Sequence, residues 1–218
     1  MEQNRQAPIG VFDSGVGGLT VAREIMRNLP SERIVYFGDT ARVPYGNKSK
    51  NIVLKFSRQI VHFLQTQEVK AIVVACNTAS ALALETIREE IDIPIIGVVK
   101  PGAKVAAEAT RNGKIGVIAT EGTINSQIYS TYIKQINENI HVIGKACPLF
   151  VPLVEEGLLV DPDRLVEAFK PFDRVSGKRG KGGAVQLPGS RRKQRPVHEG
   201  RFAGSGYAAY RSKASYRE

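Results

Sequence analysis

The sequence predicts an α/β fold with a parallel sheet. Three observations support this prediction. Short runs rich in Val and Ile alternate with longer amphipathic stretches between residues 9 and 147. Several of these runs are almost continuously apolar, as expected for parallel strands that are buried on both faces. Glycines and polar residues follow the runs, and ligands of such sheets bind at the carboxyl ends of the strands.

Each element is predicted from its own pattern. The first strand is the apolar run 9–14, and an amphipathic helix follows the glycines over 19–29. A second strand, 33–39, precedes a helix over 49–67, in which Ile52, Phe56, Ile60 and Phe63 recur at helical spacing. The pattern then repeats, with strands predicted over 70–76, 94–99, 114–120 and 141–147 and helices over 78–91, 101–111 and 123–137.

The last part of the chain has a different composition. Residues 171–218 hold 12 Lys and Arg against 3 Asp and Glu, whereas residues 1–170 hold 19 against 18, so this tail carries most of the net charge of +10. It is rich in Gly, Arg and Ser and poor in large aliphatic residues. Because it cannot bury enough apolar surface to offset its ordering entropy, we expect a disordered basic tail.

Composition also limits the class of protein. No apolar run approaches the roughly 20 residues of a membrane span, and the first residues have no apolar signal core. The two cysteines, Cys76 and Cys147, have no paired spacing for a disulfide or zinc, and the three histidines lack metal-ligand spacing. We therefore expect a reduced, cytoplasmic protein that uses no metal, with no membrane partner.

The first strand ends in a glycine-rich turn, "DSGVGG", over 13–18. It is neither a dinucleotide fingerprint, because position 20 is Thr, nor a Walker A loop, because no Lys follows the glycines. Asp13 would repel a phosphate. A carboxylate and the Ser14 hydroxyl beside free backbone N–H groups suit a zwitterionic ligand better, although a tight turn fits the same residue types.

The third strand ends on a cysteine. Cys76 stands at the expected rim of the sheet with a helix after it, and a helix N-terminus can lower a thiol pKa, so Cys76 could act as a nucleophile or base. Asn77 and Thr78 could cap that helix or bind a ligand. A buried core cysteine remains the alternative. Cys147 lies among apolar residues, which favours a structural role.

Several motifs together resemble the aspartate/glutamate racemase family. They are "IGVFDSGVGGLTV", "YFGDTARVPYG", "VVACNTASA", "PIIGVV", "IGVIATEGTI" and "CPLFVPLVEEG", in the family's order from residue 8 to about 160. The resemblance implies Rossmann- or flavodoxin-like lobes and a cofactor-independent racemase that makes D-glutamate for bacterial peptidoglycan. It implies Cys76 as one catalytic thiol and the substrate-binding residues Asp13, Ser14, Tyr45, Gly46, Asn77 and Thr78. Thr120, Thr123 and Glu155 are implied near the site.

The sequence departs from the family after about residue 165. The family's second catalytic cysteine lies in a Gly-Cys-Thr-His segment, which these 218 residues do not contain, and Cys147 matches a different motif. We expect a first lobe over 1–98, a partial second lobe over 99–170 and the tail over 171–218. A shifted coding frame near residue 171 would explain the change, as would a natural fusion or truncation.

Three functions stay open on the sequence alone. The first is a racemase acting on glutamate, impaired by the absent second cysteine. The second is a one-cysteine enzyme of the same superfamily that transfers a proton on one face of its substrate. The third is nucleic-acid binding by the tail, whose Arg, Gly, Tyr and Phe residues suit charge and stacking contacts. The expected partner is glutamate, and a homodimer is one assembly the resemblance leaves open.

Overall fold

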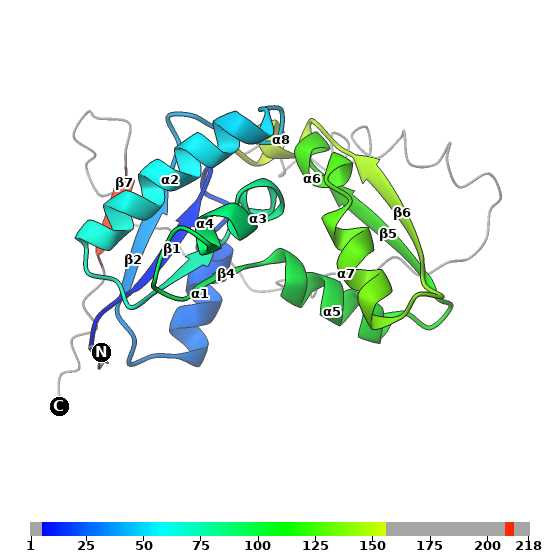
Figure 1. Cartoon of the computed structure of the whole chain (residues 1–218), viewed down its shortest axis with the longest axis horizontal. Helices are drawn as coiled ribbons and strands as arrows, with labels where there is room; N and C mark the ends of the chain where they lie inside the picture. Colours follow the sequence, from blue (N-terminus) through cyan, green and yellow to red (C-terminus); the bar gives the residue numbers. More distant parts are fainter. Residues whose placement is uncertain (1–5, 156–207, 212–218) are drawn as a thin grey trace, which may run out of the picture.

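The computed structural model describes residues 6–155 and 208–211 (Figure 1). Its strands are β1 (Ile9–Asp13), β2 (Ile34–Gly38), β3 (Ala71–Val74), β4 (Ile95–Gly97), β5 (Lys114–Ala119), β6 (His141–Ala146) and β7 (Ala208–Arg211). Its helices are α1 (Leu19–Asn28), α2 (Lys50–Thr66), α3 (Asn77–Leu82), α4 (Leu84–Arg88), α5 (Val99–Ala109), α6 (Glu121–Asn125), α7 (Ile128–Ile136) and α8 (Phe150–Glu155). The predicted α/β class with parallel strands is confirmed.

The first lobe contains a five-stranded sheet in the order β4-β3-β1-β2-β7. Strands β1 to β4 are parallel, and β7 is antiparallel to β2. The order β2-β1-β3-β4 is that of flavodoxin-like folds, in which the chain changes direction across the sheet between β1 and β3. The ends of β1 and β3 therefore lie side by side at the position where such sheets bind ligands.

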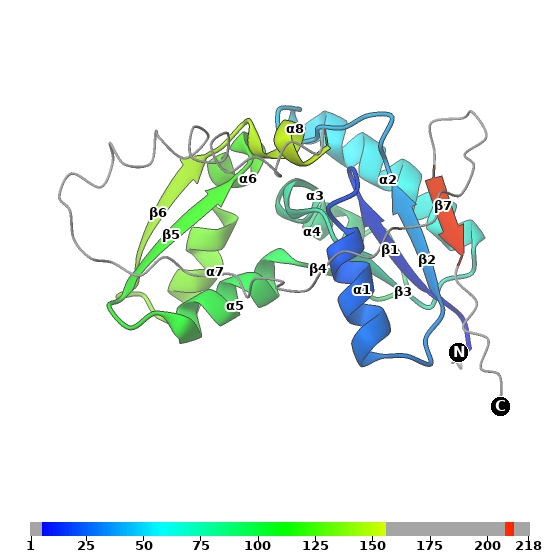
Figure 2. The same ribbon diagram turned by 180° about the vertical axis from the view of Figure 1, so that it is seen from behind.

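Helices cover both faces of this sheet, because its strand residues alternate between two cores. Phe12, Phe37 and Val74 pack with residues of α2, α3 and α4. Val11 and Tyr36, which point the other way, pack against α1. Figures 1 and 2 show α2 and α1 on opposite sides of the strands. The near-continuous apolar runs of the sequence follow from this double burial.

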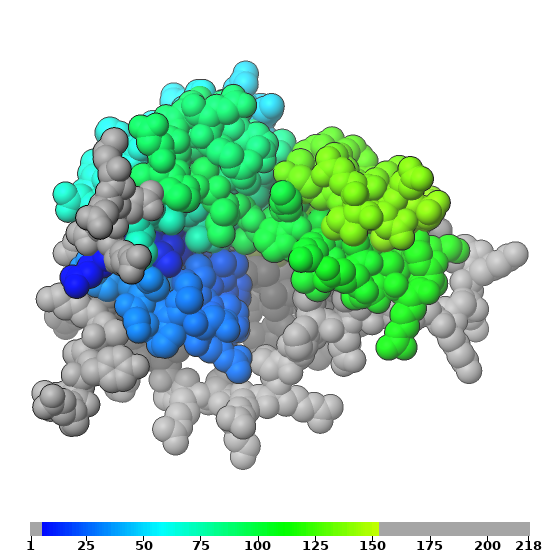
Figure 3. Space-filling model, turned by 60° about the horizontal axis from the view of Figure 1, so that its bottom comes forward, coloured from blue at the N-terminus to red at the C-terminus, as the bar shows by residue number. Residues whose placement is uncertain are grey.

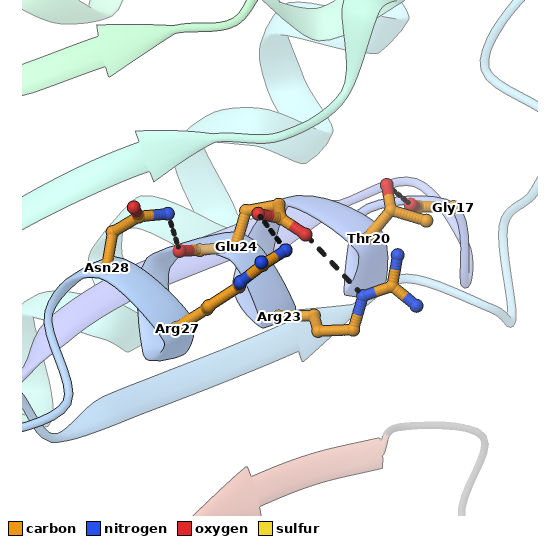
Figure 4. A network of polar contacts seen from close by, with 6 residues as sticks. All are labelled: Gly17, Thr20, Arg23, Glu24, Arg27 and Asn28. Carbon is orange, nitrogen blue, oxygen red and sulfur yellow. Dashed lines mark hydrogen bonds and ion pairs between the residues drawn. The ribbon is translucent and has the colours of Figure 1, made fainter. Parts of the chain in front are cut away.

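Helix α1 is held in place by the face that packs against the sheet. On its outer surface, Glu24 lies between Arg23 and Arg27, with N···O distances of 3.9 and 4.0 Å, and Asn28 Nδ2 donates to the Glu24 carbonyl at 2.7 Å (Figure 4). Exposed pairs of this kind contribute at most about 1 kcal/mol. Ala22, which is buried against the sheet, therefore anchors the helix more than these polar contacts do.

The second lobe is built on the two-stranded parallel sheet β5–β6. One face packs against α5 and α7, where Ala103 and Ile133 are fully buried. On these strands Ile118 and Ile143 are 40% and 49% exposed. In Figure 1 the arrows of β1 and β6 both point to the upper side of the molecule, so the carboxyl ends of both sheets meet near α3 and α6. Figure 3, turned by 60° about the horizontal axis so that the bottom of the molecule comes forward, shows the two lobes joined by the green residues.

Two predicted helices are interrupted in the structure. The helix expected over 78–91 is divided into α3 and α4 at Ala83, whose φ and ψ of −124° and −23° depart from helical values. The helix expected over 123–137 is divided into α6 and α7 at Gln127, which adopts a left-handed conformation with φ of 56°. Apolar periodicity continues through both breaks, so the sequence pattern did not reveal them.

The tail differs from the expectation at one place. Residues Ala208–Arg211 form β7, which pairs with β2 through main-chain hydrogen bonds, although no regular structure was predicted from their composition. A sheet edge presents unpaired N–H and C=O groups to any extended segment, which explains how a strand forms here. The rest of the predicted disordered tail, and its predicted nucleic-acid binding, lie outside the described residues. The division at residues 98 and 170 stays a prediction.

Candidate functional site

The candidate site lies where β1 and β3 end. Asp13 is the last residue of β1, Ser14 follows it, and Cys76 lies just beyond β3. Cys76 Sγ is 3.4 Å from Ser14 Oγ, although 62 residues separate them in the sequence. The order of the strands brings these two chain segments together, because β1 pairs directly with β3. The predicted grouping of polar residues at the strand ends is therefore seen in the structure.

Glycines let the turn after β1 fold closely over the strand ends. The Gly18 N–H donates to Asp13 Oδ2 at 2.8 Å, and a Cβ at Gly18 would lie 2.5 Å from the Asp13 Cβ. A Cβ at Gly38 would lie 2.7 Å from the carbonyl oxygen of Gly15, which also accepts a hydrogen bond from Tyr36. Real Cβ atoms do not approach so closely. The turn thus keeps the Asp13 carboxylate buried and fixed beside Ser14.

The environment of Cys76 disfavours its thiolate. Burial, followed by the negative charge of Asp13, raises the pKa of Cys76 to about 11. The Ala79 N–H, which donates to Sγ at 3.4 Å, and the Ser14 hydroxyl lower it by smaller amounts. The sequence suggested that a helix N-terminus would lower this pKa. That effect is present at α3 but is outweighed, because the side chain is 96% buried and a carboxylate lies nearby.

The Tyr45 side chain is almost fully buried and belongs to the same core cluster as Cys76. Its hydroxyl donates to Asp39 Oδ2, and its ring packs against Phe56 with centroids 5.6 Å apart. Asp39 is fully buried and is also paired with Arg42 Nε at 2.7 Å. Burial and the bond to Asp39 raise the pKa of Tyr45 well above its usual range. The phenol therefore fixes the loop that leads to Gly46, a role that the sequence did not indicate.

Gly46 and Thr78, in the first lobe, contact residues of the second lobe. The Gly122 N–H donates to the Gly46 carbonyl at 2.9 Å. Thr78 Oγ1 lies 2.8 Å from Thr120 Oγ1, which lies 3.0 Å from Thr123 Oγ1. A Cβ at Gly46 would be only 2.4 Å from the Thr120 Cβ, so the lobes meet without space for a side chain. The expectation that Thr120 and Thr123 lie near the other site residues agrees with this arrangement.

Asn77 makes a second contact between the lobes. Tyr129, on α7, donates its hydroxyl hydrogen to Asn77 Oδ1 at 2.7 Å. Tyr129 was not predicted from the sequence, because its apolar neighbours place it in an ordinary amphipathic helix. The two residues meet because the Tyr129 side chain reaches from α7, which packs against α5, to the first residue of α3, and no sequence signal encodes this arrangement.

The remaining predicted residues lie apart from this group or cannot be described. Cys147 is buried at the end of β6, where its thiol contacts the Lys145 carbonyl at 3.7 Å, and burial raises its pKa. Glu155 ends α8, and its side chain lies outside the described part of the chain. Within residues 6–155 and 208–211, no three His, Cys, Asp or Glu side chains gather as a metal site would need. None of the helices in those ranges combines the length and apolarity of a membrane span.

In this α/β protein a buried thiol lies beside a hydroxyl and a carboxylate at the direction change of a parallel sheet, which is where sheets of this topology generally bind small ligands. Comparison with known proteins identifies the family. Residues 9–159 match the family described as Asp/Glu/Hydantoin racemase, and the chain belongs to this family. The resemblance seen in the sequence is confirmed.

Individual relatives support the same assignment. The chain is 58% identical over 149 residues to a glutamate racemase of Geobacter metallireducens, covering 68% of this chain and 55% of the relative. It is 53% identical over 167 residues to one of Oceanobacillus iheyensis, covering 75% and 61%. A crystal structure of the Francisella tularensis glutamate racemase with D-glutamate superposes with a TM-score of 0.73 at 44% identity, covering 80% and 65%. The chain thus spans 55–61% of the length of these two curated relatives.

Proposed function

We propose that this chain binds glutamate at the Asp13–Ser14–Cys76 site and that Cys76 exchanges the proton on the α-carbon. The observation that carries the proposal is the buried thiol, 3.4 Å from Ser14 Oγ and close to the Asp13 carboxylate. The family match and the Francisella tularensis relative, whose crystal structure holds D-glutamate, support glutamate as the ligand.

The residues at the rim suit the two ends of an amino acid. Asp13 would face the ammonium group, and the hydroxyls and amides of Ser14, Asn77 and Thr78 would face a carboxylate. The negative charge of Asp13 is one reason why the pKa of Cys76 is high. A bound ammonium would offset that charge and so favour the thiolate that the reaction needs. The substrate would thereby help to activate its own base.

A single thiol limits the reaction to one face of the α-carbon. The Cys76 thiolate would take the α-proton, leaving the electron pair on a carbanion that polar donors stabilise. In D₂O the thiol would exchange its proton for deuterium. It would then deliver the deuterium to the same face of the α-carbon, so the configuration would be kept. Racemisation needs a second acid on the opposite face. Cys76 is the thiol at this site among the described residues, and for it we propose α-proton exchange without inversion, in a cytoplasmic relative of the peptidoglycan-supplying racemases.

Proton NMR of L- and D-glutamate with the full chain in D₂O tests this proposal. We expect the α-proton signal of one enantiomer to disappear while the configuration is retained. Cys76→Ala should abolish the exchange, and the matched control Cys147→Ala, at the other buried cysteine, should leave it unchanged.

Other outcomes are equally informative. Inversion would show that a second base acts, and the one-face proposal would be wrong. No exchange of either enantiomer by a folded chain would refute the enzymatic proposal. Translating the coding DNA in its other two frames would test the origin of the tail separately, since a Gly-Cys-Thr-His segment in another frame supports a shift and its absence from both frames excludes one.

A further inference from the structure

Helix α7 of the second lobe reaches the residue next to the thiol. Tyr129 OH lies 2.7 Å from Asn77 Oδ1, and Asn77 follows Cys76 directly. The Tyr129 side chain lies against α5 at Gly102. A Cβ at that glycine would be only 3.3 Å from the Tyr129 hydroxyl oxygen. Burial raises the pKa of Tyr129, so the hydroxyl stays protonated and donates.

This bond determines which atom of the Asn77 amide remains for a ligand. A carboxamide has an acceptor oxygen on one side and a donor nitrogen on the other. Tyr129 uses the oxygen, and within the described residues the nitrogen Nδ2 makes no hydrogen bond. Asn77 is exposed, so a ligand can reach Nδ2. Rotation of the amide by 180° would instead present an oxygen and repel a carboxylate.

We infer that Tyr129 is a positioning residue that orients the Asn77 amide so that its N–H groups face the carboxylate of the bound amino acid. The inference rests on the proposed function. Because Tyr129 belongs to the second lobe and Asn77 to the first, the hydrogen bond between them also makes ligand affinity depend on contact between the lobes. Tyr129 touches no reacting atom in this scheme and acts through Asn77.

A tyrosine on the same helix provides the matched control. Tyr132, one turn further along α7, donates to Glu85 Oε1 at 3.3 Å, and this bond joins α7 to α4. It links the same two lobes but involves no residue beside Cys76. If Tyr129 only held the lobes together, Tyr129→Phe and Tyr132→Phe should have similar effects on ligand binding.

Calorimetric titration of the full chain with glutamate tests the inference. We expect Tyr129→Phe to weaken the Kd by about three- to tenfold, the effect of one hydrogen bond, and Tyr132→Phe to leave it unchanged. In an Asn77→Ala background, Tyr129→Phe should have no further effect on Kd, because the two residues act as a unit. Melting temperatures of the variants identify any general loss of folding.

Side-chain NMR gives a readout that an ordinary packing role would not change. The Asn77 Nδ2 resonances, assigned by their loss in Asn77→Ala, should show an ordered amide in the parent chain and in Tyr132→Phe, and a mobile one in Tyr129→Phe. Equal Kd values for the parent and Tyr129→Phe would overturn the inference and leave the proposed function intact. Failure of the parent chain to bind either enantiomer of glutamate would overturn both.

Discussion

Replacing Asp13 with Asn should make the Cys76 thiol more acidic. With a pKa of about 11, only about one thiol in a thousand is ionised at pH 8. Burial is the larger cause of this high pKa, and the Asp13 charge is the second. Removing a like charge from such a site changes a pKa by about one, so Asp13→Asn should increase the thiolate about tenfold, or ~1.4 kcal/mol. Asn is nearly the same size and can still accept the Gly18 N–H bond.

The rate of alkylation by iodoacetamide between pH 7.5 and 10.5 measures this change. The assay needs a Cys147→Ser background, so that only one thiol reacts. Ser14→Ala serves as a control of opposite sign, because the Ser14 hydroxyl lowers the pKa of Cys76 and its removal should slow alkylation. If the Asp13→Asn profile coincides with that of the parent chain, burial alone sets the thiol pKa. The proposed activation of Cys76 by a bound ammonium would then lose its basis.

Three further predictions concern stability. Gly46→Ala should destabilise the chain by about 1–3 kcal/mol in urea unfolding, because its Cβ would lie 2.4 Å from that of Thr120, and Thr120→Gly should relieve the effect. Tyr45→Phe should lower the free energy of unfolding by about 1–3 kcal/mol, because the fully buried Asp39 loses a hydrogen-bond donor. The alkylation rate of Cys76 should change by no more than about twofold, and a larger change would place the phenol at the site. Between pH 9 and 10 the free energy of unfolding should fall with a slope of up to about 1.4 kcal/mol per pH unit, because the Cys76 thiol loses its proton at a lower pH in the unfolded chain than in the folded chain. Cys76→Ser should flatten the slope, and an unchanged slope would contradict the raised pKa.

The parts of the structure that the sequence predicted depend on local pattern. Buried parallel strands need apolar residues on both faces, so β1 to β6 could be recognised from their Val and Ile runs. The rule that ligands bind at strand ends then indicated Asp13, Ser14 and Cys76 as neighbours. The distance of 3.4 Å between Ser14 Oγ and Cys76 Sγ agrees with that prediction.

The parts that the sequence did not predict depend on packing between distant segments. The predicted role of Tyr45 in substrate binding stays a prediction, and no motif indicated the bond from its hydroxyl to the buried Asp39. The pKa of Cys76 depends on how deeply the thiol is buried, which no motif encodes. The bond from Tyr129 to Asn77 requires the arrangement of the two lobes. The residue types indicate which chemistry is possible, whereas burial and the contact between the two lobes determine which atoms are available for it.

The pairing of β7 with β2 shows how little sequence information a sheet edge requires. Val35 is paired with Arg211 and Gly38 with Ala208, and the contacts are made by main-chain atoms that every residue except proline can supply. A labelled synthetic peptide of this segment should therefore bind to a chain shortened before residue 208, and a scrambled, proline-free peptide should compete with it. The free edge of β2 would then be a general attachment point, usable for adding a reporter or a tether without altering the residues around Cys76.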